Sequence, residues 1–443
     1  MRPLIALLAL FAATSAVAEP RLIAALDIDA SRHDLAVQTA GTLEDGVSGN
    51  ILGGLGSGLA WAGEDTFLML PDRGPNATPY DASVDNTTRY YNRFHSFRFQ
   101  REPASTDLPF TIRATLEATT LLWSPKSLAY KGEAPALNAA DRFYFNGRSD
   151  QFDAAKGSTN PDNARFDPEG IRVSADGKSV FISDEYGPYL YQFDRATGQR
   201  LKSFALPAKF AAAHLSLKGD EEIAGNASGR VANKGMEGLA ITPDGRTLVG
   251  IMQSPLAQDG GTKASYVRLV TVDIVTGVTH EYAYGLSNIG TVEKPKYAGI
   301  SEIVAVNDHQ FLVDERDGKG RGGVGEPSFK NLFLIDLDGA SDVSGLSGAE
   351  ALAGKAVTKT VFLDMVAGLK ASGVAGDTIP EKIEDVSFGP DVTLNGVAIH
   401  TLWIASDNDF LSTIDGKPNP NSVYVFGFSD ADLPGYVPQV LAR

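Results

Sequence analysis

The chain is dominated by short runs in which apolar and polar positions alternate, or in which β-branched and aromatic residues follow one another. Turn-forming Gly, Asp and Asn residues separate these runs, so the pattern predicts strands joined by tight turns. Apolar residues at helical spacing favour a helix only near residues 208–217 and 362–370. We therefore expect an all-β protein.

Five segments repeat one motif, in which a short strand, a polar turn and a second apolar strand with a polar end follow one another. The first strands start at Ser57, Glu169, Glu237, Glu302 and Glu384, and the four glutamates are 68, 65 and 82 residues apart. Repeats of this length with several strands each are typical of propeller blades. The 112 residues from Ser57 to Glu169 leave room for a further blade or an insertion. The sequence predicts a single β-propeller for which we expect six blades, with five or seven left open.

The first eighteen residues have the pattern of a secretory signal peptide. A basic start precedes an apolar run from Leu4 to Ala13, and small residues occupy positions 16 and 18. We expect cleavage near Ala18-Glu19, so that residues 1–18 are the signal peptide and residues 19–443 form the propeller domain of a secreted or periplasmic protein. No later stretch reaches the roughly 18 apolar residues of a membrane span, and we expect a monomer.

Composition excludes several kinds of function. The formal net charge is 39 − 55 = −16, which repels nucleic-acid backbones and favours cations. The chain contains no cysteine, which excludes disulfides, thiolate catalysis and cysteine-bound zinc. Its six histidines form no His-x-x-x-His pair, and no Gly-x-Ser-x-Gly nucleophile motif occurs.

The register of the hairpins brings acidic residues together. Asp176-Gly177, Asp244-Gly245 and Asn395-Gly396 are tight-turn signals that place the start of a first strand beside the end of the second strand. First strands line the central channel of a propeller, so these ends meet at one mouth and we expect a channel lined by acidic residues. The acids expected to bind metal there are Glu169, Glu237, Glu302 and Glu384, surrounded by Asp72, Glu185, Glu315 and Asp407.

Carboxylates this close cannot all be ionised unless positive charge lies among them. Calcium accepts six to eight oxygen ligands in flexible geometry, so we expect Ca²⁺, with another divalent cation left open. Arg73 and Arg316 directly follow acids of the ring, and Lys234 precedes the third repeat. We expect these three side chains to hold a phosphate or carboxylate group of a substrate. The alternative is that the acids only end strands near solvent and the cations are ordinary surface charges.

Eight motifs together resemble those of the exported phytase-like proteins that are described as having esterase-like activity. They are Gly53-Gly54-Leu55-Gly56-Ser57-Gly58-Leu59, Asp72-Arg73-Gly74, Asp167-Pro168-Glu169-Gly170-Ile171, Ser183-Asp184-Glu185-Tyr186-Gly187-Pro188, Asn233-Lys234-Gly235-Met236-Glu237-Gly238-Leu239, Gln253-Ser254-Pro255-Leu256, and Ser301-Glu302-Ile303 with Asp314-Glu315-Arg316-Asp317. The chain is also loosely similar to the calcium-dependent propeller phytases and phosphatases. The resemblance covers nearly all of the mature chain and implies a β-propeller and a hydrolase.

Three functions are compatible with these residues. The first is a metal-dependent hydrolase of phosphate esters, in which a metal-bound water attacks while Arg73, Lys234 and Arg316 hold the phosphate oxygens. The second is a hydrolase of a carboxylic ester or lactone that uses the same metal. The third is a non-catalytic propeller that binds a ligand or partner at its mouth and keeps the metal as a structural element.

Overall fold

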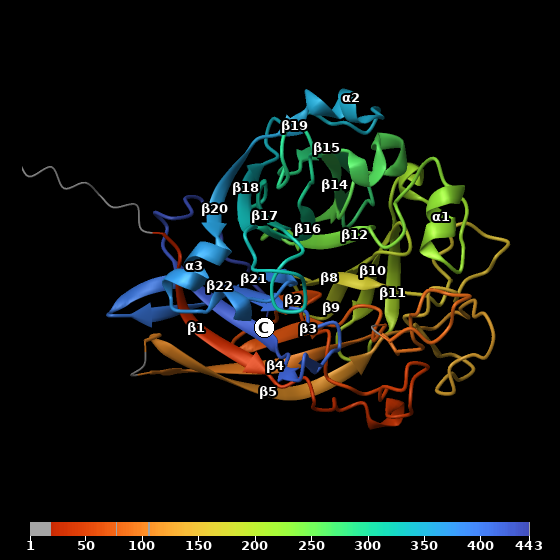
Figure 1. The fold of residues 1–443 in the computed structure, drawn as a ribbon, viewed down its shortest axis with the longest axis horizontal. Coiled ribbons are helices and arrows are strands. Elements are labelled where there is room, and N and C mark those ends of the chain that lie inside the picture. Colours follow the sequence, from red (N-terminus) through yellow and green to blue (C-terminus); the bar gives the residue numbers. More distant parts are fainter. Residues whose placement is uncertain (1–18, 77, 105–106, 443) are drawn as a thin grey trace, which may run out of the picture.

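Five sheets stand around a common axis in the computed structural model, which describes residues 19–76, 78–104 and 107–442 (Figure 1). Each sheet is a blade whose first strand lies innermost. The all-β propeller prediction is therefore confirmed. The blade count is five, one of the numbers left open, and not the six that we expected. The proposed leader, residues 1–18, lies outside the described residues.

The strands of each blade follow one another from the axis outward. The first blade is β2 (Gly58–Trp61), β3 (Thr66–Leu70), β4 (Arg93–Pro103) and β5 (Phe110–Leu121). The second is β8 (Pro168–Val173), β9 (Ser179–Asp184), β10 (Tyr189–Asp194) and β11 (Arg200–Ala205). The third is β12 (Met236–Ile241), β13 (Thr247–Met252), β14 (Tyr266–Asp273), β15 (Thr279–Gly285) and β19 (Ala356–Val357).

Two more blades complete the ring. The fourth is β16 (Gly299–Ala305), β17 (Gln310–Arg316), β18 (Lys330–Asp336) and β20 (Lys359–Asp364). The fifth is β21 (Ile383–Leu394), β22 (Val397–Ser406), β25 (Asn421–Phe428) and β1 (Arg21–Ile28). Because β1 pairs with β25 from Arg21↔Gly427 to Ile28↔Asn421, a strand from the N-terminal end of the described chain completes the last blade.

The remaining elements are short. Two small hairpins are β6 (Trp123–Ser124) with β7 (Phe143–Tyr144), and β23 (Thr413–Ile414) with β24 (Lys417–Pro418). The α-helices are α1 (Gly219–Gly225), α2 (Ala349–Ala353) and α3 (Met365–Ala371), and single 3₁₀ turns occupy Val37–Thr39, Ala208–Phe210, Ala257–Asp259, Gly261–Lys263 and Gly376–Thr378. Of the two expected helices, the one near residues 362–370 starts three residues late, and the one near 208–217 is reduced to a 3₁₀ turn. None of the helices in the described ranges is both long and apolar enough to cross a membrane.

The long interval before Glu169 holds an insertion and not a sixth blade. The outer strands β4 and β5 are 11 and 12 residues long and complete the first blade. Residues 122–167 then run mostly as irregular chain, with β6 and β7 as the only strands among these described residues.

The innermost strands β2, β8, β12, β16 and β21 each lie against the next one and close into a narrow ring (Figure 1). Glycines make the closest approaches possible. A Cβ on Gly170 would lie 2.6 Å from the backbone N of Leu239, and a Cβ on Gly238 would lie 2.8 Å from the Cα of Glu302. The hydrophobic core lies between blades; for example, Trp403 of the fifth blade packs 4.5 Å from Phe67 of the first, ring centre to ring centre.

Candidate functional site at one mouth of the propeller

The turns that we expected are confirmed, but the register at the other end of the hairpins contains a feature that the sequence does not reveal. Four of the five innermost strands carry an irregularity or β-bulge near their first residues. A bulge adds one residue to one strand of a pair and redirects its side chain. The residues in the bulges are Glu169 with Gly170, Glu237, Ser301 and Glu384. In β16 the position equivalent to the other glutamates is therefore occupied by Ser301 and not by Glu302.

Seven buried carboxylates gather at this end of the hairpins, and we call them the acidic mouth. They are Asp72, Asp167, Glu169, Glu185, Glu237, Glu384 and Asp407. Four cationic side chains lie among them: Arg73, Lys234, Arg316 and Lys382. Seven negative against four positive charges leave an excess of three negative charges in a site with little access to water. Such an excess of buried negative charge destabilises the folded protein unless a further cation binds or the carboxylates take up protons.

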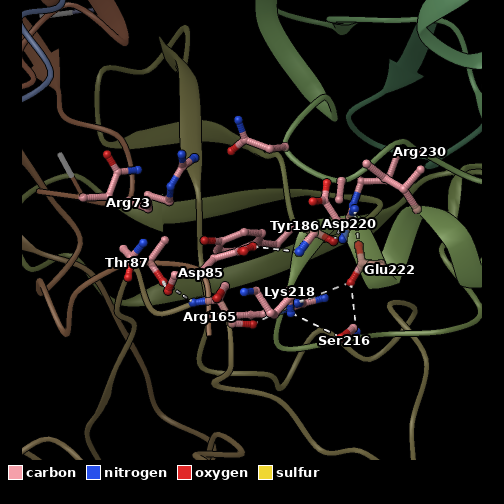
Figure 2. Close-up of a pocket in the computed structure, with 17 residues that line it drawn as sticks. Arg73, Asp85, Thr87, Arg165, Tyr186, Ser216, Lys218, Asp220, Glu222 and Arg230 are labelled. Atoms are coloured by element: carbon pink, nitrogen blue, oxygen red, sulfur yellow. Dashed lines mark hydrogen bonds and ion pairs between the residues drawn. The ribbon is translucent and has the colours of Figure 1, made fainter. Parts of the chain in front are cut away.

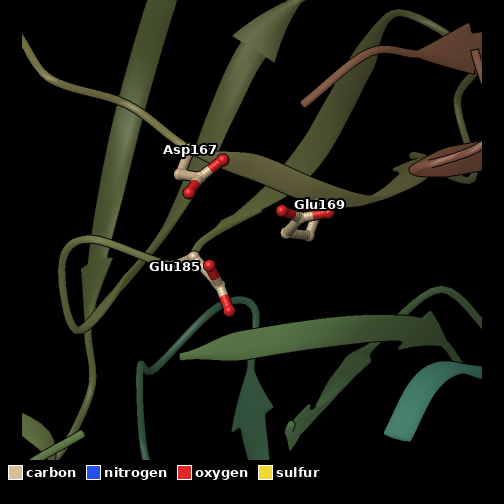
Figure 3. Close-up of side chains that lie close together, drawn as sticks. All are labelled: Asp167, Glu169 and Glu185. Carbon is tan, nitrogen blue, oxygen red and sulfur yellow. The ribbon is translucent and has the colours of Figure 1, made fainter. Parts of the chain in front are cut away.

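Three of these carboxylates form a cluster with the spacing of metal ligands (Figure 3). One oxygen from each of Asp167, Glu169 and Glu185 lies within 4.8 Å of the others. Asp167 directly precedes β8, Glu169 lies in β8 and Glu185 directly follows β9. The second blade alone therefore supplies this cluster, at the edge where its first strand begins and its second strand ends.

Protonation of the acidic mouth is shifted because its carboxyl groups are buried close to one another. Burial raises the pKa of Asp72 to about 7 and that of Asp167 to about 6. Burial, followed by the charge of Glu237, raises the pKa of Glu169 well above its ordinary value. Burial and Glu185 do the same for the pKa of Glu237. A bound cation favours the charged carboxylates, so it would lower these pKa values and displace protons from the site.

Arg73 follows β3 and reaches across to the second blade. Its Nη1 lies 2.6 Å from Oδ2 of Asp167 and 4.0 Å from Oε2 of Glu185, and its backbone N–H donates to Asp167 Oδ1 at 3.2 Å. The buried Nε of Arg73 has no hydrogen-bond partner within the described ranges. Although burial opposes the charge, Asp167 and its neighbours hold the pKa of Arg73 above its ordinary value. Arg73 is thus a fixed cation beside the carboxylate cluster.

The other cations each have a defined partner. The Nε of Arg316 donates to Ser301 Oγ at 2.9 Å, and its Nη2 pairs with Glu384. Lys234 Nζ donates to Gln253 Oε1 at 3.0 Å, and Gln253 in turn donates to Glu237 Oε1 at 2.6 Å. Lys382, which precedes β21, lies 3.2 Å from Asp407 Oδ2 and 2.6 Å from Asp409 Oδ1.

Two residues expected to bind metal lie elsewhere. Glu302 sits deeper in the channel, where its Oε1 accepts from the backbone of Leu239 at 2.8 Å and Oε2 lies 2.9 Å from Arg172 Nη2. The bulge in β16 is the physical reason, since it turns Glu302 inward. Glu315 pairs with Lys359, accepts from the Tyr284 hydroxyl, and receives the backbone N–H of Ser287 at 2.9 Å. We therefore leave Glu302 and Glu315 out of the candidate site.

Sequence reasoning missed Asp167 and Lys382 at the mouth, and Arg172 and Asp385 in the channel. Asp167 stands two residues before Glu169, and Lys382 stands two residues before Glu384. Asp385 forms a side-chain hydrogen bond with Glu302, and burial and Glu302 raise the pKa of Asp385 well above its ordinary value. The available signal was the charged residue that stands close to a repeat's glutamate in the sequence. The repeat pattern alone does not show which of these charged side chains point toward the axis.

A cavity of about 420 Å³ opens beside the acidic mouth (Figure 2). Arg73 and Tyr186 form the side nearest the carboxylate cluster, and Arg165, Arg230, Lys218 and Glu222 line other parts of it. The Tyr186 hydroxyl donates to the carbonyl of Gly147 at 3.0 Å. Since Arg73 lines this cavity and pairs with Asp167, the cavity lies next to the acidic mouth.

The residues present fit a hard divalent cation. Calcium binds oxygen ligands at about 2.3–2.6 Å, so two ligands of one ion are separated by up to about 5 Å, and the 4.8 Å limit of the cluster agrees with this. Within the described part of the chain, no group donates a hydrogen bond to Glu169, and Oε2 of Glu237 is buried without a partner. These oxygens are available as ligands, whereas soft sulfur ligands are excluded by composition.

Five blades around a ring of buried acids define a β-propeller with a candidate metal centre at one mouth. The chain belongs to the phytase-like family described as "Esterase-like activity of phytase", whose model matches residues 50–410. This confirms the resemblance seen in the motifs.

Other similarities are more limited. An "Uncharacterized secreted protein" of Arthroderma benhamiae is 35% identical over 179 residues, a match that spans 34% of this chain and 34% of the relative. Among solved structures, a periplasmic gluconolactonase of Pseudomonas aeruginosa is similar, with 12% identity, a TM-score of 0.32, and coverage of 83% of this chain and 87% of that chain. The calcium-binding protein regucalcin of Agrobacterium tumefaciens has 10% identity and a TM-score of 0.33, with 88% and 94% covered.

Proposed function

We propose that the acidic mouth binds a divalent cation, Ca²⁺, and that the protein hydrolyses phosphate esters there. The observation that carries this proposal is the buried cluster of Asp167, Glu169 and Glu185, whose oxygens lie within 4.8 Å of one another in a site with excess negative charge. Membership of the phytase-like family agrees with phosphate-ester hydrolysis.

Asp167, Glu169 and Glu185 would hold the cation, with Glu237 as a further ligand through its unpartnered Oε2. Asp72 of the first blade and Glu384 and Asp407 of the fifth blade would contribute further negative charge. A bound divalent cation lowers the pKa of a coordinated water and offsets the charge of a phosphoryl group.

Arg73 is the residue best placed to orient a phosphoryl group. It lies at the boundary between the carboxylate cluster and the 420 Å³ cavity, and its buried Nε has no hydrogen-bond partner in the described chain. Its position is fixed by Asp167, so a substrate oxygen would meet a preorganised donor. We assign Lys234 and Arg316 a supporting role, because each already has a partner and contributes positive charge next to Glu237 or Glu384.

Export is part of the proposal. The leader pattern of residues 1–18 supports secretion or a periplasmic location, and the name of the A. benhamiae relative describes that protein as secreted. Millimolar calcium outside the cytosol would suit a site of moderate affinity. We propose a monomer that acts on a small molecule.

Turnover of an aryl phosphate and of the matching aryl ester tests the proposal, each with chelator and with added Ca²⁺. We expect hydrolysis of the phosphate that chelator removes and Ca²⁺ restores. Calcium-dependent turnover of the ester alone would instead identify a carboxylic ester or lactone hydrolase. Turnover of neither, with Ca²⁺ still raising the melting temperature, would identify a binding protein with a structural metal. Elemental analysis of the purified protein shows which metal it carries.

A further inference from the structure

Two buried arginines share a single glutamate in the cavity beside the mouth (Figure 2). Arg230 Nη1 lies 2.5 Å from Oε1 of Glu222, and Arg165 Nη1 lies 3.9 Å from Oε2 of the same carboxylate. Arg165, Arg230 and Glu222 are 4%, 5% and 4% exposed. One negative charge therefore faces two positive charges that are almost completely removed from water.

Both guanidinium groups also have N–H donors that nothing in the described chain satisfies. The Nη2 atoms of Arg165 and of Arg230 are buried and have no hydrogen-bond partner. Arg230 Nε donates to the carbonyl of Tyr186 at 2.8 Å, and Arg165 Nη1 donates to the carbonyl of Ser149 at 3.0 Å. A buried donor without a partner is costly, and an arginine cannot relieve the cost by losing its proton.

The other charges of the cavity do not pair with these two arginines. Among the described residues, Glu222 is the only carboxylate that forms an ion pair with Arg165 or Arg230. Arg73 is paired with Asp167 at the mouth, and Oδ2 of Asp85 accepts the backbone N–H of Gly219 at 2.9 Å.

We propose that Arg165 and Arg230 bind an anionic group, a phosphate or a carboxylate, of the same substrate whose reacting phosphoryl group lies at Arg73. This inference rests on the proposed function and deepens it, because it names the substrate class: small molecules with at least two anionic groups. Guanidinium groups bind both kinds of oxyanion through parallel N–H donors. A volume of about 420 Å³ is sufficient for such a molecule.

A bound water is the competing explanation for one of the two arginines. Arg165 also borders a separate cavity of about 10 Å³, which is near the smallest space that holds one water. Arg230 lines only the large cavity among those described, so it is the better test residue. Removing the charge of Arg230 alone would leave the buried Glu222 with Arg165, 3.9 Å away, as its ion-pair partner. Arg230→Gln is therefore combined with Glu222→Gln, and Arg246→Gln at an exposed turn serves as the control for removal of an arginine.

The direct test measures binding of inorganic phosphate and of malonate by calorimetry in the presence of chelator, which keeps the metal site out of the measurement. We expect the wild type and Arg246→Gln to bind one of the two probes with equal affinity, and the Arg230→Gln/Glu222→Gln protein to bind at least tenfold more weakly. Circular dichroism confirms that all three are folded. No binding by the wild type below ~10 mM probe, an affinity weaker than about 3 kcal/mol, would overturn the subsite. So would equal binding by the double variant, or loss of binding only in Arg73→Gln.

The kinetic test compares phenyl phosphate with 4-carboxyphenyl phosphate, which adds a second anionic group. We expect the double variant to raise KM for the carboxylated substrate at least tenfold more than KM for phenyl phosphate. An equal effect on both substrates would overturn the assignment to a second anionic group. If the wild type turns over neither substrate, the proposed function fails, and the calorimetric result alone then decides whether Arg165 and Arg230 form an anion site.

Discussion

Arg73 Nη1 lies 2.6 Å from Oδ2 of Asp167, and this ion pair joins the first blade of the propeller to the second. Arg316 does the same between the fourth and fifth blades through Glu384. Both arginines that we expected to act on substrate therefore also have a carboxylate partner on the next blade. Their role in substrate binding stays a prediction, and each variant must be measured for stability and for kinetics.

Arg73→Lys separates the two roles. Lysine keeps the charge near Asp167 but loses the planar donors that suit a phosphoryl group. We expect kcat/KM for an aryl phosphate to fall at least tenfold, about 1.4 kcal/mol, while the melting temperature changes little. Arg246→Lys, at an exposed turn, is the control. A lower melting temperature with unchanged kcat/KM per folded molecule would show that Arg73 only joins the blades.

Glu169→Gln combined with Glu237→Gln removes two candidate ligand charges and keeps the side-chain shapes. A cation that binds only the folded protein stabilises it by RT ln(1 + [L]/Kd), about 2.7 kcal/mol at a hundredfold excess over Kd. We expect the wild type to melt at higher temperature in millimolar Ca²⁺ than in chelator, and the double variant to lose this difference. Glu350→Gln, an exposed change in α2, controls for charge. A calcium shift that persists in the double variant would contradict the assignment of Glu169 and Glu237.

Arg172 closes the channel beneath the acidic mouth. Its guanidinium donates to the carbonyls of Leu59 at 2.8 Å, Ile303 at 2.9 Å and Val386 at 3.2 Å, and Nη2 also lies 2.9 Å from Glu302 Oε2. We expect Arg172→Met to cost about 3–5 kcal/mol, because it leaves a buried carboxylate unpaired. Adding Glu302→Gln removes that charge and should restore part of the loss. Unfolding in denaturant measures the stability of the two variants. Equal stability of Arg172→Met and the wild type would show that Arg172 does not stabilise the channel.

His400 gives a pH dependence that does not involve the metal site. Its ring lies 2.8 Å from Asp391 and 2.9 Å from Asp430. Burial opposes the charged imidazolium, but these two carboxylates outweigh it and raise the pKa of His400 above 6.5. A raised pKa in the folded state stabilises the fold below the unfolded value of about 6.5, and this contribution is lost as the pH rises through the folded value.

The corresponding variant is His400→Gln, compared with wild type in chelator. We expect a lower melting temperature at about pH 5.5, where the imidazolium is present, and no difference at about pH 8.5. Because Asp391 and Asp430 are largely exposed, about 0.5 M salt should reduce the difference. An equal difference at both pH values would mean that His400 acts through packing and not through charge.

The repeated hairpins made the fold predictable from the sequence. Asp176-Gly177 and Asn395-Gly396 lie at the turns that their residue types indicated, and the acids follow from that register. The bulges were not predictable, because a single extra residue in a short strand cannot be recognised from the pattern of apolar residues. This is why Glu302 was placed one position too far toward the mouth.

Neither the cavity nor the number of blades could be predicted from the sequence pattern. Arg165 lies in the insertion before β8 and Arg230 follows α1, and neither region has a periodic pattern. Their proximity depends on how two irregular segments pack against each other. The blade count depended on whether residues 122–167 pair as strands, and irregular pairing cannot be read from local propensity.

The pairing of β1 with β25 also sets the order in which the protein can be completed. Ile28 is paired with Asn421, nearly 400 residues later in the chain. At a synthesis rate of about 5–20 residues per second, the first strand waits roughly 20–80 seconds for its partner to exist. During that time β1 and the outer edge of the ring are unpaired strand edges, which are prone to wrong association. Any chain that stops before Asn421 leaves β1 without its partner, so the fifth blade can close only after β25 has been synthesised.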